Sequence, residues 1–247
     1  MNSRQKTLVE KLYKLGRLFI KEEATAFAVA PMTIRRDIQF FESQGIAIRT
    51  HGGAVPRVNE PLQIFTQSEA SAIQKKIARK AVEMIPAEST LMLSTGSTTL
   101  EVARQLAASD LRICVITNSL PIAAVLFQTK IQVVLTGGSL RSNSLDLTGP
   151  VTEKNLDEYY IDILITGCDG VSQDGFFTKD LNLAEMEKKS VKKSAKTIVV
   201  TESHKFNKPA FVKFASLNEI STVITDKKLP DEFSRQLLHS GIELILL

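Results

Sequence analysis

The stretch PMTIRRDIQFFESQG, residues 31–45, has the pattern of a short amphipathic helix. Its apolar residues recur at helical spacing on one face, namely Ile34, Ile38 and Phe41. Pro31 suits the first helical position, and Gly45 suits the residue just past the end. The other side carries Thr33, Arg35, Arg36 and Gln39. These side chains suit phosphates and base edges, so the pattern fits a helix that enters the major groove of DNA, or else an ordinary basic surface helix.

The flanking residues favour the DNA-binding interpretation. Residues 21–28 predict a second short helix, and the short link Val29-Ala30 is typical of a helix-turn-helix pair. Ala30 stands at the N-cap of the next helix, although alanine has no side chain that can cap. Residues 46–51 predict a strand, and the glycines that follow predict a tight turn at the start of a wing. His51 in this wing is placed to touch a phosphate.

These motifs resemble the signature of the DeoR family of bacterial transcription regulators. The matching residues are Thr33-Ile34-Arg35-Arg36-Asp37, Glu42, Gly45, Arg49 and His51-Gly52-Gly53-Ala54. The family usually has Ser where Ala30 stands, a departure that affects the cap and not the groove-facing side chains. The resemblance implies a winged helix-turn-helix that binds a double-stranded DNA operator through Thr33, Arg35, Arg36, Gln39, Arg49 and His51.

The positive charge of the chain is concentrated near its N-terminus. The net charge is +4 over 247 residues, and residues 1–58 contain ten Lys and Arg against five Asp and Glu. This distribution fits binding of a polyanion by the N-terminal segment. The chain has two cysteines, no run of about 18 apolar residues and no apolar signal core at its start. We therefore expect a cytoplasmic protein without a membrane span.

The sequence predicts two domains joined by a linker. An opening helix over residues 3–15 completes a winged helix-turn-helix domain over residues 1–57, and residues 58–72 lack a sustained period, which predicts a linker. Residues 73–247 alternate short apolar strands with helices, which predicts an α/β domain with a mostly parallel sheet. The expected strands are 90–93, 113–117, 132–136, 161–166, 197–201, 222–225 and 243–246.

Polar and glycine-rich residues follow five of these strands, at the sheet edge where ligands bind in parallel α/β folds. The first such segment, residues 94–99, is rich in Ser and Thr and precedes a helix. It fits either an anion-binding loop or a βα turn with an N-cap. Together the five strand ends predict a site for a small, polar, anionic molecule. Lys205 or Arg141 would supply positive charge, and Asp169 would accept sugar hydroxyls.

The DeoR-family resemblance extends across these strand ends. The matching residues are Gly96-Ser97-Thr98-Thr99, Thr117-Asn118-Ser119-Leu120-Pro121, Gly137-Gly138-Ser139-Leu140-Arg141, Gly149, Asp169-Gly170 and Ser203-His204-Lys205-Phe206. The family's sensor domain resembles phosphosugar isomerases in fold, and its effectors are mostly phosphorylated sugars or related metabolites. The resemblance implies an effector site built from Gly96, Ser97, Thr98, Thr99, Asn118, Gly138, Arg141, Asp169 and Lys205.

This chain departs from the family's sensor pattern at three places. Ser94 stands where many members have Asp, and Glu202 replaces a common Asp. An acidic position after Asp180 is hard to align, and Glu185 is the nearest candidate for it. These departures bear on the identity of the effector more than on its class.

Three functions fit the sequence. The first is a transcriptional regulator, a repressor of a carbohydrate-metabolism operon controlled by a phosphorylated sugar. The alternative is a phosphosugar isomerase-like enzyme in which Asp169 and Lys205 act as base and acid. The basic winged helix favours the regulator, and so does the lack of a carboxylate following Asp169-Gly170. A third possibility is a nucleoid-type DNA binder whose C-terminal domain only dimerises.

For the regulator we expect no catalytic residues, no metal and no cofactor. Its partners would be operator DNA and the small phosphorylated effector. Because operators are commonly two-fold symmetric, a homo-oligomer, either a dimer or a tetramer, is expected.

Overall fold

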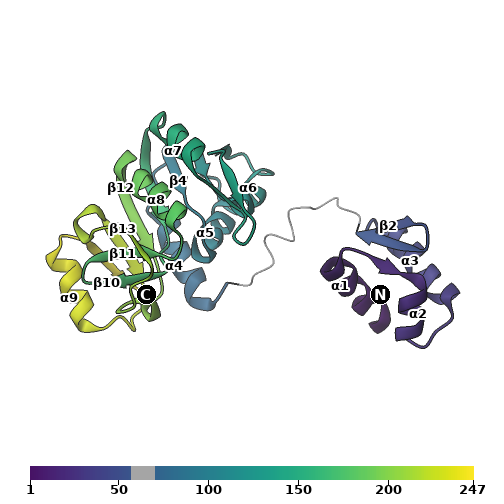
Figure 1. Ribbon diagram of the computed structural model, residues 1–247. Helices are drawn as coiled ribbons and strands as arrows, with labels where there is room; N and C mark the ends of the chain where they lie inside the picture. Colours follow the sequence, from purple (N-terminus) through teal and green to yellow (C-terminus); the bar gives the residue numbers. More distant parts are fainter. Residues whose placement is uncertain (57–69) are drawn as a thin grey trace. The chain divides into compact units, whose positions relative to one another are not determined.

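The computed structural model describes residues 1–56 and 70–247, which belong to two compact units (Figure 1). The linker expected at residues 58–72 falls largely outside the described residues. Its last part is described, with the Ser71 hydroxyl accepting a hydrogen bond from the backbone of Gln74 as the N-cap of the first helix of the larger unit.

The smaller unit is a winged helix-turn-helix. Its sheet is antiparallel, with the strand order β1-β3-β2, so the short strand after the first helix pairs with the wing. Its elements are α1 (Ser3–Leu15), β1 (Leu18–Phe19), α2 (Ile20–Ala26), α3 (Pro31–Ser43), β2 (Ala47–Thr50) and β3 (Gly53–Pro56).

The apolar face predicted for residues 31–45 is the core of this unit. Ile34, Ile38 and Phe41 are at most 1% exposed and pack in one cluster with side chains of α1. Ala30 makes no side-chain capping bond, as its chemistry requires. The helix predicted at residues 21–28 ends earlier, at Ala26, because Ala28 has a left-handed φ of 50° that a helix cannot continue through.

The larger unit is built on a seven-stranded parallel sheet with the order β15-β14-β12-β9-β4-β5-β6. All seven strands overlap the predicted ranges, although β12 begins three residues before the expected start at 197. They are β4 (Thr90–Leu93), β5 (Cys114–Thr117), β6 (Gln132–Leu135), β9 (Ile161–Thr166), β12 (Ser194–Val200), β14 (Thr222–Thr225) and β15 (Glu243–Leu246). The α/β fold class with a mostly parallel sheet is therefore confirmed.

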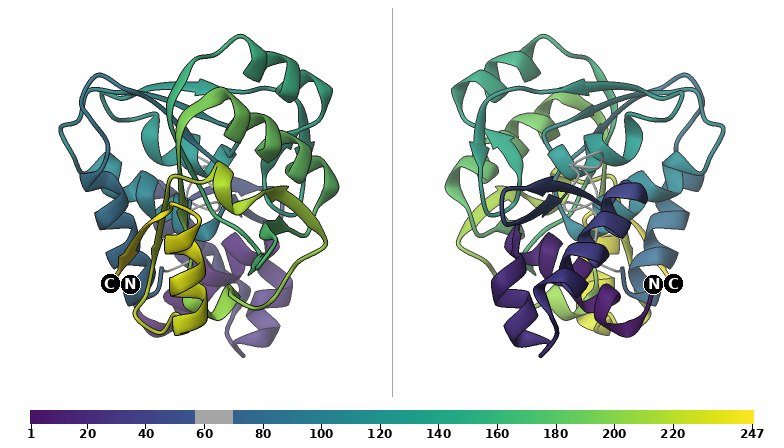
Figure 2. Two further views of the ribbon diagram at one scale, coloured as in Figure 1. Left: turned by 90° about the vertical axis from the view of Figure 1, so that its left-hand side faces the viewer. Right: turned by 90° about the vertical axis from the view of Figure 1, so that its right-hand side faces the viewer.

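Helices cover both faces of this sheet. Along β4, Leu91 and Leu93 pack on one face and Met92 on the other, because successive side chains of a strand point in opposite directions. The first face is covered by α4 (Ala72–Glu83), α5 (Ser97–Ala107) and α6 (Leu120–Leu126). The second is covered by α7 (Pro150–Asp157), α8 (Leu181–Lys193) and α9 (Asp231–His239). The two views of Figure 2 show helices on both sides of the strands.

Two small antiparallel sheets were not expected from the sequence. One is the hairpin of β7 (Ser139–Arg141) and β8 (Asp146–Thr148), and the other combines β10 (Gly170–Ser172), β11 (Gly175–Thr178) and β13 (Val212–Ala215). Phe176 of β11 and Phe214 of β13 belong to the core on the second face.

The helix α8 passes into β12 with no intervening loop, since Lys193 ends the helix and Ser194 begins the strand.

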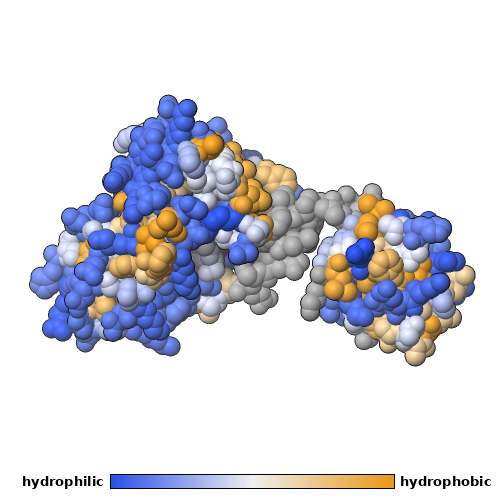
Figure 3. All heavy atoms as spheres, viewed as in Figure 1, coloured by the Kyte–Doolittle hydropathy of each residue, from blue (hydrophilic) through white to orange (hydrophobic). Residues whose placement is uncertain are grey.

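On the face drawn in Figure 3, the surface of the larger unit is mostly hydrophilic, and its exposed apolar side chains form separate small groups. Within residues 1–56 and 70–247, no helix has the length and apolar character needed to cross a membrane.

Candidate functional sites

The outer face of α3 carries cations that have no acidic partner among residues 1–56 and 70–247. Arg35, Arg36 and Gln39 are exposed, and Thr33 is half-buried. Within the described part of the chain, no carboxylate lies within 4.0 Å of either arginine. These guanidinium groups are therefore free to contact phosphates or guanine edges.

The wing presents its two predicted residues differently. His51 is exposed in the turn between β2 and β3. Arg49 is also exposed, but its Nε lies 2.7 Å from Oε2 of Glu42 at the end of α3. This ion pair connects the wing to α3, so a DNA contact through Arg49 would share or replace it.

Two buried carboxylates of the smaller unit were missed by the sequence reasoning. Asp37 on α3 is 4% exposed and accepts hydrogen bonds from Arg4 and Gln5 of α1. Glu23 on α2 is 6% exposed and pairs with Lys11 of α1 at 2.9 Å. The signal for the first was present, since Asp37 closes the quoted Thr-Ile-Arg-Arg-Asp motif. Both carboxylates fasten α1 to the helix-turn-helix pair.

A cavity of about 550 Å³ lies where the strand order of the large sheet reverses. The chain runs from β4 outward to β6 and then returns to β9 on the other side of β4, so β4 and β9 flank the switch point at which open α/β sheets bind ligands. The cavity is lined by Thr95, Gly96, Ser97, Thr98, Thr99, Arg141, Asn143, Ser144, Gly167, Cys168, Asp169, Thr178, Lys179, Asp180, Leu183, Glu187, Lys205 and Phe214.

The N-terminus of α5 supplies one end of this cavity. Gly96 is its N-cap, with φ 152°, a backbone conformation that favours glycine. The hydroxyl of Thr99 donates to the Gly96 carbonyl at 3.0 Å, while Thr98 is buried and Ser97 exposed. The first N–H groups of a helix have no acceptor within it, so this end of the cavity offers donors and a partial positive charge to an anion.

Lys205 and Asp169 enter the cavity from the ends of β12 and β9. The Lys205 Nζ donates to the carbonyl of Cys168 at 2.7 Å, which fixes the ammonium group beside the cavity. Asp169 Oδ2 accepts from the Thr178 hydroxyl and from the Lys179 N–H. Burial raises the pKa of the Cys168 thiol to about 11, so this cysteine remains a neutral thiol in the wall.

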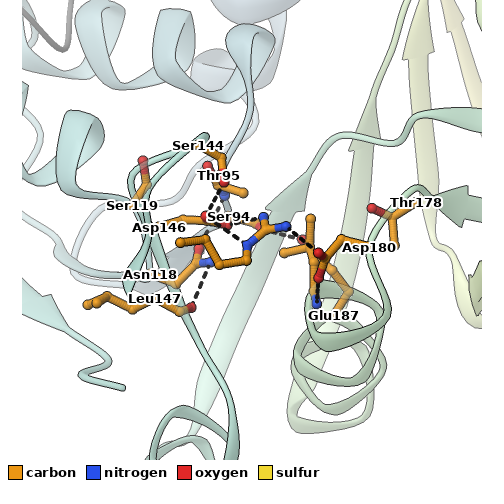
Figure 4. Close-up of polar contacts among 12 residues, drawn as sticks. Ser94, Thr95, Asn118, Ser119, Ser144, Asp146, Leu147, Thr178, Asp180 and Glu187 are labelled. Carbon is orange, nitrogen blue, oxygen red and sulfur yellow. Dashed lines mark hydrogen bonds and ion pairs between the residues drawn. The ribbon is translucent and has the colours of Figure 1, made fainter. Parts of the chain in front are cut away.

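Arg141 lines the cavity as predicted, but its guanidinium is already engaged. Nε and Nη2 donate to Asp146 at 3.0 and 2.6 Å, and Nη1 lies 3.0 Å from Asp180, the N-cap of α8. The dashed lines in Figure 4 trace this network from Ser144 and Asp146 to Asp180. Although burial acts to raise it, the pKa of Asp180 is lowered by the Leu183 N–H and by Arg141. Arg141 thus joins the β7–β8 hairpin to α8.

Two predicted effector residues do not line the cavity. Asn118 is fully buried, accepts a hydrogen bond from the Thr95 N–H and donates to the Leu147 carbonyl, so it joins the β4 and β8 loops. Gly138 packs against the start of α7, where an added Cβ would lie 2.0 Å from the hydroxyl oxygen of Thr152. Both hold neighbouring segments in place.

Glu187 on α8 was not predicted and is the buried carboxyl of the cavity. It is 3% exposed, and one of its oxygens, Oε1, accepts a hydrogen bond from the Ser94 hydroxyl. Burial raises the pKa of Glu187 to about 7, with the hydroxyls of Ser94 and Thr166 acting in the opposite direction. Glu185, the nearest candidate in the sequence for the family's acidic position after Asp180, instead pairs with Lys188 on the surface of the same helix. The expected lack of a carboxylate concerned only the residues directly after Asp169-Gly170, and Glu187 brings a carboxyl to the same cavity from α8.

The winged helix with unpaired arginines, followed by a separate α/β unit, defines the class of DNA-binding transcription regulators. Two family models match the chain, the DeoR-like helix-turn-helix domain over residues 4–59 and the DeoR C terminal sensor domain over residues 69–227. The chain therefore belongs to the DeoR family of transcriptional regulators.

Named relatives span nearly the whole chain. The "Putative aga operon transcriptional repressor" of Escherichia coli O157:H7 is 30% identical over 99% of this chain and 93% of its own length. The "HTH-type transcriptional regulator GlpR" of Haloferax volcanii is 34% identical over 86% and 85%, and the "Glycerol-3-phosphate regulon repressor" of Escherichia coli K12 is 31% identical over 98% of each chain. Ribose 5-phosphate isomerase A from Methanocaldococcus jannaschii matches 55% of this chain and 54% of its own with a TM-score of 0.41 and 22% identity.

Proposed function

We propose that this protein represses a carbohydrate-metabolism operon, and that a phosphorylated sugar or related metabolite controls its binding to DNA. The cavity at the switch point between β4 and β9 carries this proposal, since it combines a helix N-terminus, a lysine and carboxylates. The printed names of two relatives, a repressor of an aga operon and a repressor of a glycerol-3-phosphate regulon, support the same class of function.

In this proposal the effector's phosphate binds at the start of α5. The backbone N–H groups and hydroxyls of residues 97–99 donate to it, and Lys205 adds a full positive charge. Asp169 accepts hydrogen bonds from sugar hydroxyls. Arg141 contributes by fixing the β7–β8 hairpin over the cavity wall, because its own donors are taken up by Asp146 and Asp180.

The DNA contact would come from the free face of α3. Arg35, Arg36, Gln39 and Thr33 would face the major groove, while His51 and Arg49 would contact the backbone from the wing. Because operators with two-fold symmetry bind two copies of a reading helix, we propose a homo-oligomer that acts in the cytoplasm, where its operator lies.

A matched pair of ligands tests the effector site. Calorimetry of the full chain with glucose and glucose 6-phosphate, and with glycerol and glycerol 3-phosphate, should show binding of at least one phosphorylated member and none of its free partner. Lys205→Met should weaken that binding about tenfold or more, as loss of a charged hydrogen bond does. Lys208→Met, an exposed lysine outside the cavity lining, is the control. Equal binding of the free compound would refute the phosphate site.

Glu187 is the one observation that favours an isomerase, because a carboxyl with a pKa near 7 is suited to proton transfer. We propose that the protein has no such activity, in agreement with the regulatory names of its relatives. Incubation of the protein with glucose 6-phosphate and with ribose 5-phosphate in D2O tests this. Loss of the C2 proton signal in ¹H NMR would show enolisation and overturn the non-enzymatic proposal.

A further inference from the structure

Glu187 has one carboxyl oxygen with a partner and one without. Oε1 accepts the hydrogen bond from Ser94, a fully buried residue at the end of β4. Oε2 is also buried, yet it has no hydrogen-bond partner among the described residues, because the neighbouring hydroxyl of Thr166 donates to the Gly167 carbonyl at 3.1 Å. Glu187 belongs to the cavity lining, so this acceptor lies at the wall of a space that a ligand can fill. Figure 4 shows Glu187 and Ser94 from these two elements within the same polar cluster.

The cations of the cavity do not satisfy this carboxyl. Among the residues that the structure describes, no Lys, Arg or His nitrogen lies within 4.0 Å of it. Arg141 is committed to Asp146 and Asp180, and Lys205 donates to the Cys168 carbonyl. A buried polar atom left unpaired destabilises the fold, and an apolar side chain of similar size would avoid that cost. An unpaired buried carboxyl oxygen at the wall of this cavity therefore points to a role in binding.

We propose that Glu187 is a specificity residue for the effector, and that its Oε2 accepts a hydrogen bond from a hydroxyl or ammonium group on the carbon skeleton of a phosphorylated polyol. This inference rests on the proposed function of the cavity. On the α8 side of the cavity, Glu187 would bind the carbon skeleton of the ligand and not its phosphate. The sequence alone did not single out this residue.

The requirement for a donor follows from the chemistry of the carboxyl. Burial raises the pKa of Glu187 to about 7, and a hydrogen-bond donor bound at Oε2 would stabilise the ionised form. In that form the carboxylate only accepts hydrogen bonds and repels phosphate, so it cannot help to bind the phosphate group itself. The loop that follows Ser94 leads directly into the start of α5, which places Glu187 beside the anion-binding end and not within it. Glu187 therefore distinguishes a polyol phosphate from inorganic phosphate.

Glu185 provides a matched control on the same helix. It lies two residues before Glu187, is exposed, and pairs with Lys188 at 2.7 Å. Residues two apart on a helix do not share a face. Glu185→Gln removes the same charge from α8 without altering the cavity.

The test is calorimetry of the full chain with inorganic phosphate, glycerol 3-phosphate, ribose 5-phosphate, glucose 6-phosphate and glucosamine 6-phosphate. We expect the tightest polyol phosphate to bind wild type at least tenfold more tightly than inorganic phosphate. Glu187→Met should abolish most of this advantage and leave the affinity for inorganic phosphate unchanged, which also shows that the variant is folded. Glu185→Gln should behave as wild type.

Glu187→Gln separates the two donor types, because the amide keeps an acceptor but loses the charge. If Glu187→Gln loses little affinity, the donor is a hydroxyl. If it loses as much affinity as Glu187→Met, and wild type prefers glucosamine 6-phosphate to glucose 6-phosphate, the donor is an ammonium. A polyol phosphate that binds wild type tightly and Glu187→Met equally well overturns this inference and leaves the proposed function standing. If none of the five compounds binds wild type, the proposed function fails together with the inference.

Discussion

The guanidinium of Arg4 on α1 donates from Nε to Oδ2 of Asp37 at 2.8 Å and from Nη2 to Oδ1 at 3.4 Å. Asp37 lies on the buried side of α3, one residue after the exposed pair Arg35 and Arg36. Its Oδ1 also accepts from the side chain of Gln5 at 2.8 Å. The orientation of the DNA-reading face is thus determined by polar contacts to α1 as well as by the apolar core.

Replacing Asp37 by Asn should loosen α3. The amide cannot accept bidentate bonds from Arg4, and it places a donor against another donor in a site that is 4% exposed. We expect the melting temperature of the DNA-binding unit to fall by several degrees and affinity for operator DNA to fall with it. Hydrogen exchange of residues 1–56 in the full chain would measure the first effect. Glu22→Gln, an exposed substitution on α2, should change neither.

Arg35 and Arg36 should carry most of the DNA contact of α3. Loss of a bidentate contact to guanine costs about 1–3 kcal/mol of discrimination between the right and the wrong base. Loss of a phosphate contact weakens binding to every sequence, and it lowers by about one the slope of the logarithm of the binding constant against the logarithm of the salt concentration. Arg35→Ala and Arg36→Ala should be titrated on operator and random DNA at two salt concentrations. Arg79→Ala, an exposed arginine of α4, is the control. Undiminished affinity in both variants would exclude α3 as the reading helix.

Stability should depend on pH through Glu187. Burial raises its pKa to about 7 from an ordinary value of 4.5, so between these values the folded state holds a proton that the unfolded state has lost. The free energy of unfolding should therefore fall as pH rises through this window, by at most about 1.4 kcal/mol per pH unit, and level off above it. Urea unfolding of wild type and Glu187→Gln at pH 5, 6 and 7 measures the difference. A pH slope that survives unchanged in Glu187→Gln would contradict this assignment.

Arg141→Lys should test whether Arg141 acts as a ligand or as a structural bridge. A lysine cannot bond two carboxylates at once, and Asp146, which is fully buried, would lose most of its pairing. We expect a loss of roughly 3 kcal/mol in stability, typical of breaking a buried pair. If Arg141 instead contacts the effector, the variant should keep its stability and lose affinity for the phosphorylated ligand.

The sequence predicted the elements that have a strong period. The seven strands of the parallel sheet alternate with apolar helices, and the core face of α3 repeats at Ile34, Ile38 and Phe41. The hairpins at residues 139–148 and 170–178 were missed because their strands, SLR, DLT, GVS and GFFT, lack the runs of Val, Ile and Leu that mark the buried parallel strands.

The carboxyl of the cavity was missed for a different reason. Glu185 was favoured only by its place in the family pattern. Helical spacing favours the other residue, because Glu187 lies four residues after Leu183 and four before Val191, on the apolar side of α8. α8 packs against β9 and β12, which buries Glu187 next to Ser94 and leaves Glu185 in solvent. Asn118 and Gly138 were predicted to bind the effector but instead hold neighbouring segments together. Polar residues and glycines at strand ends can therefore be needed for the structure of the loops and not for a ligand.

The direct passage from α8 into β12 limits where residues can be inserted into or deleted from this chain. The segment from Asp180 to Lys205 contributes Glu187 from its helix and Lys205 from beyond its strand, and no loop at residues 193–194 can absorb an added residue. One inserted residue there would turn the helix by about 100° or shift the strand register by one position, which reverses its faces. Natural insertions and deletions should therefore be excluded from this junction and tolerated in exposed turns outside the cavity lining, such as residues 173–174.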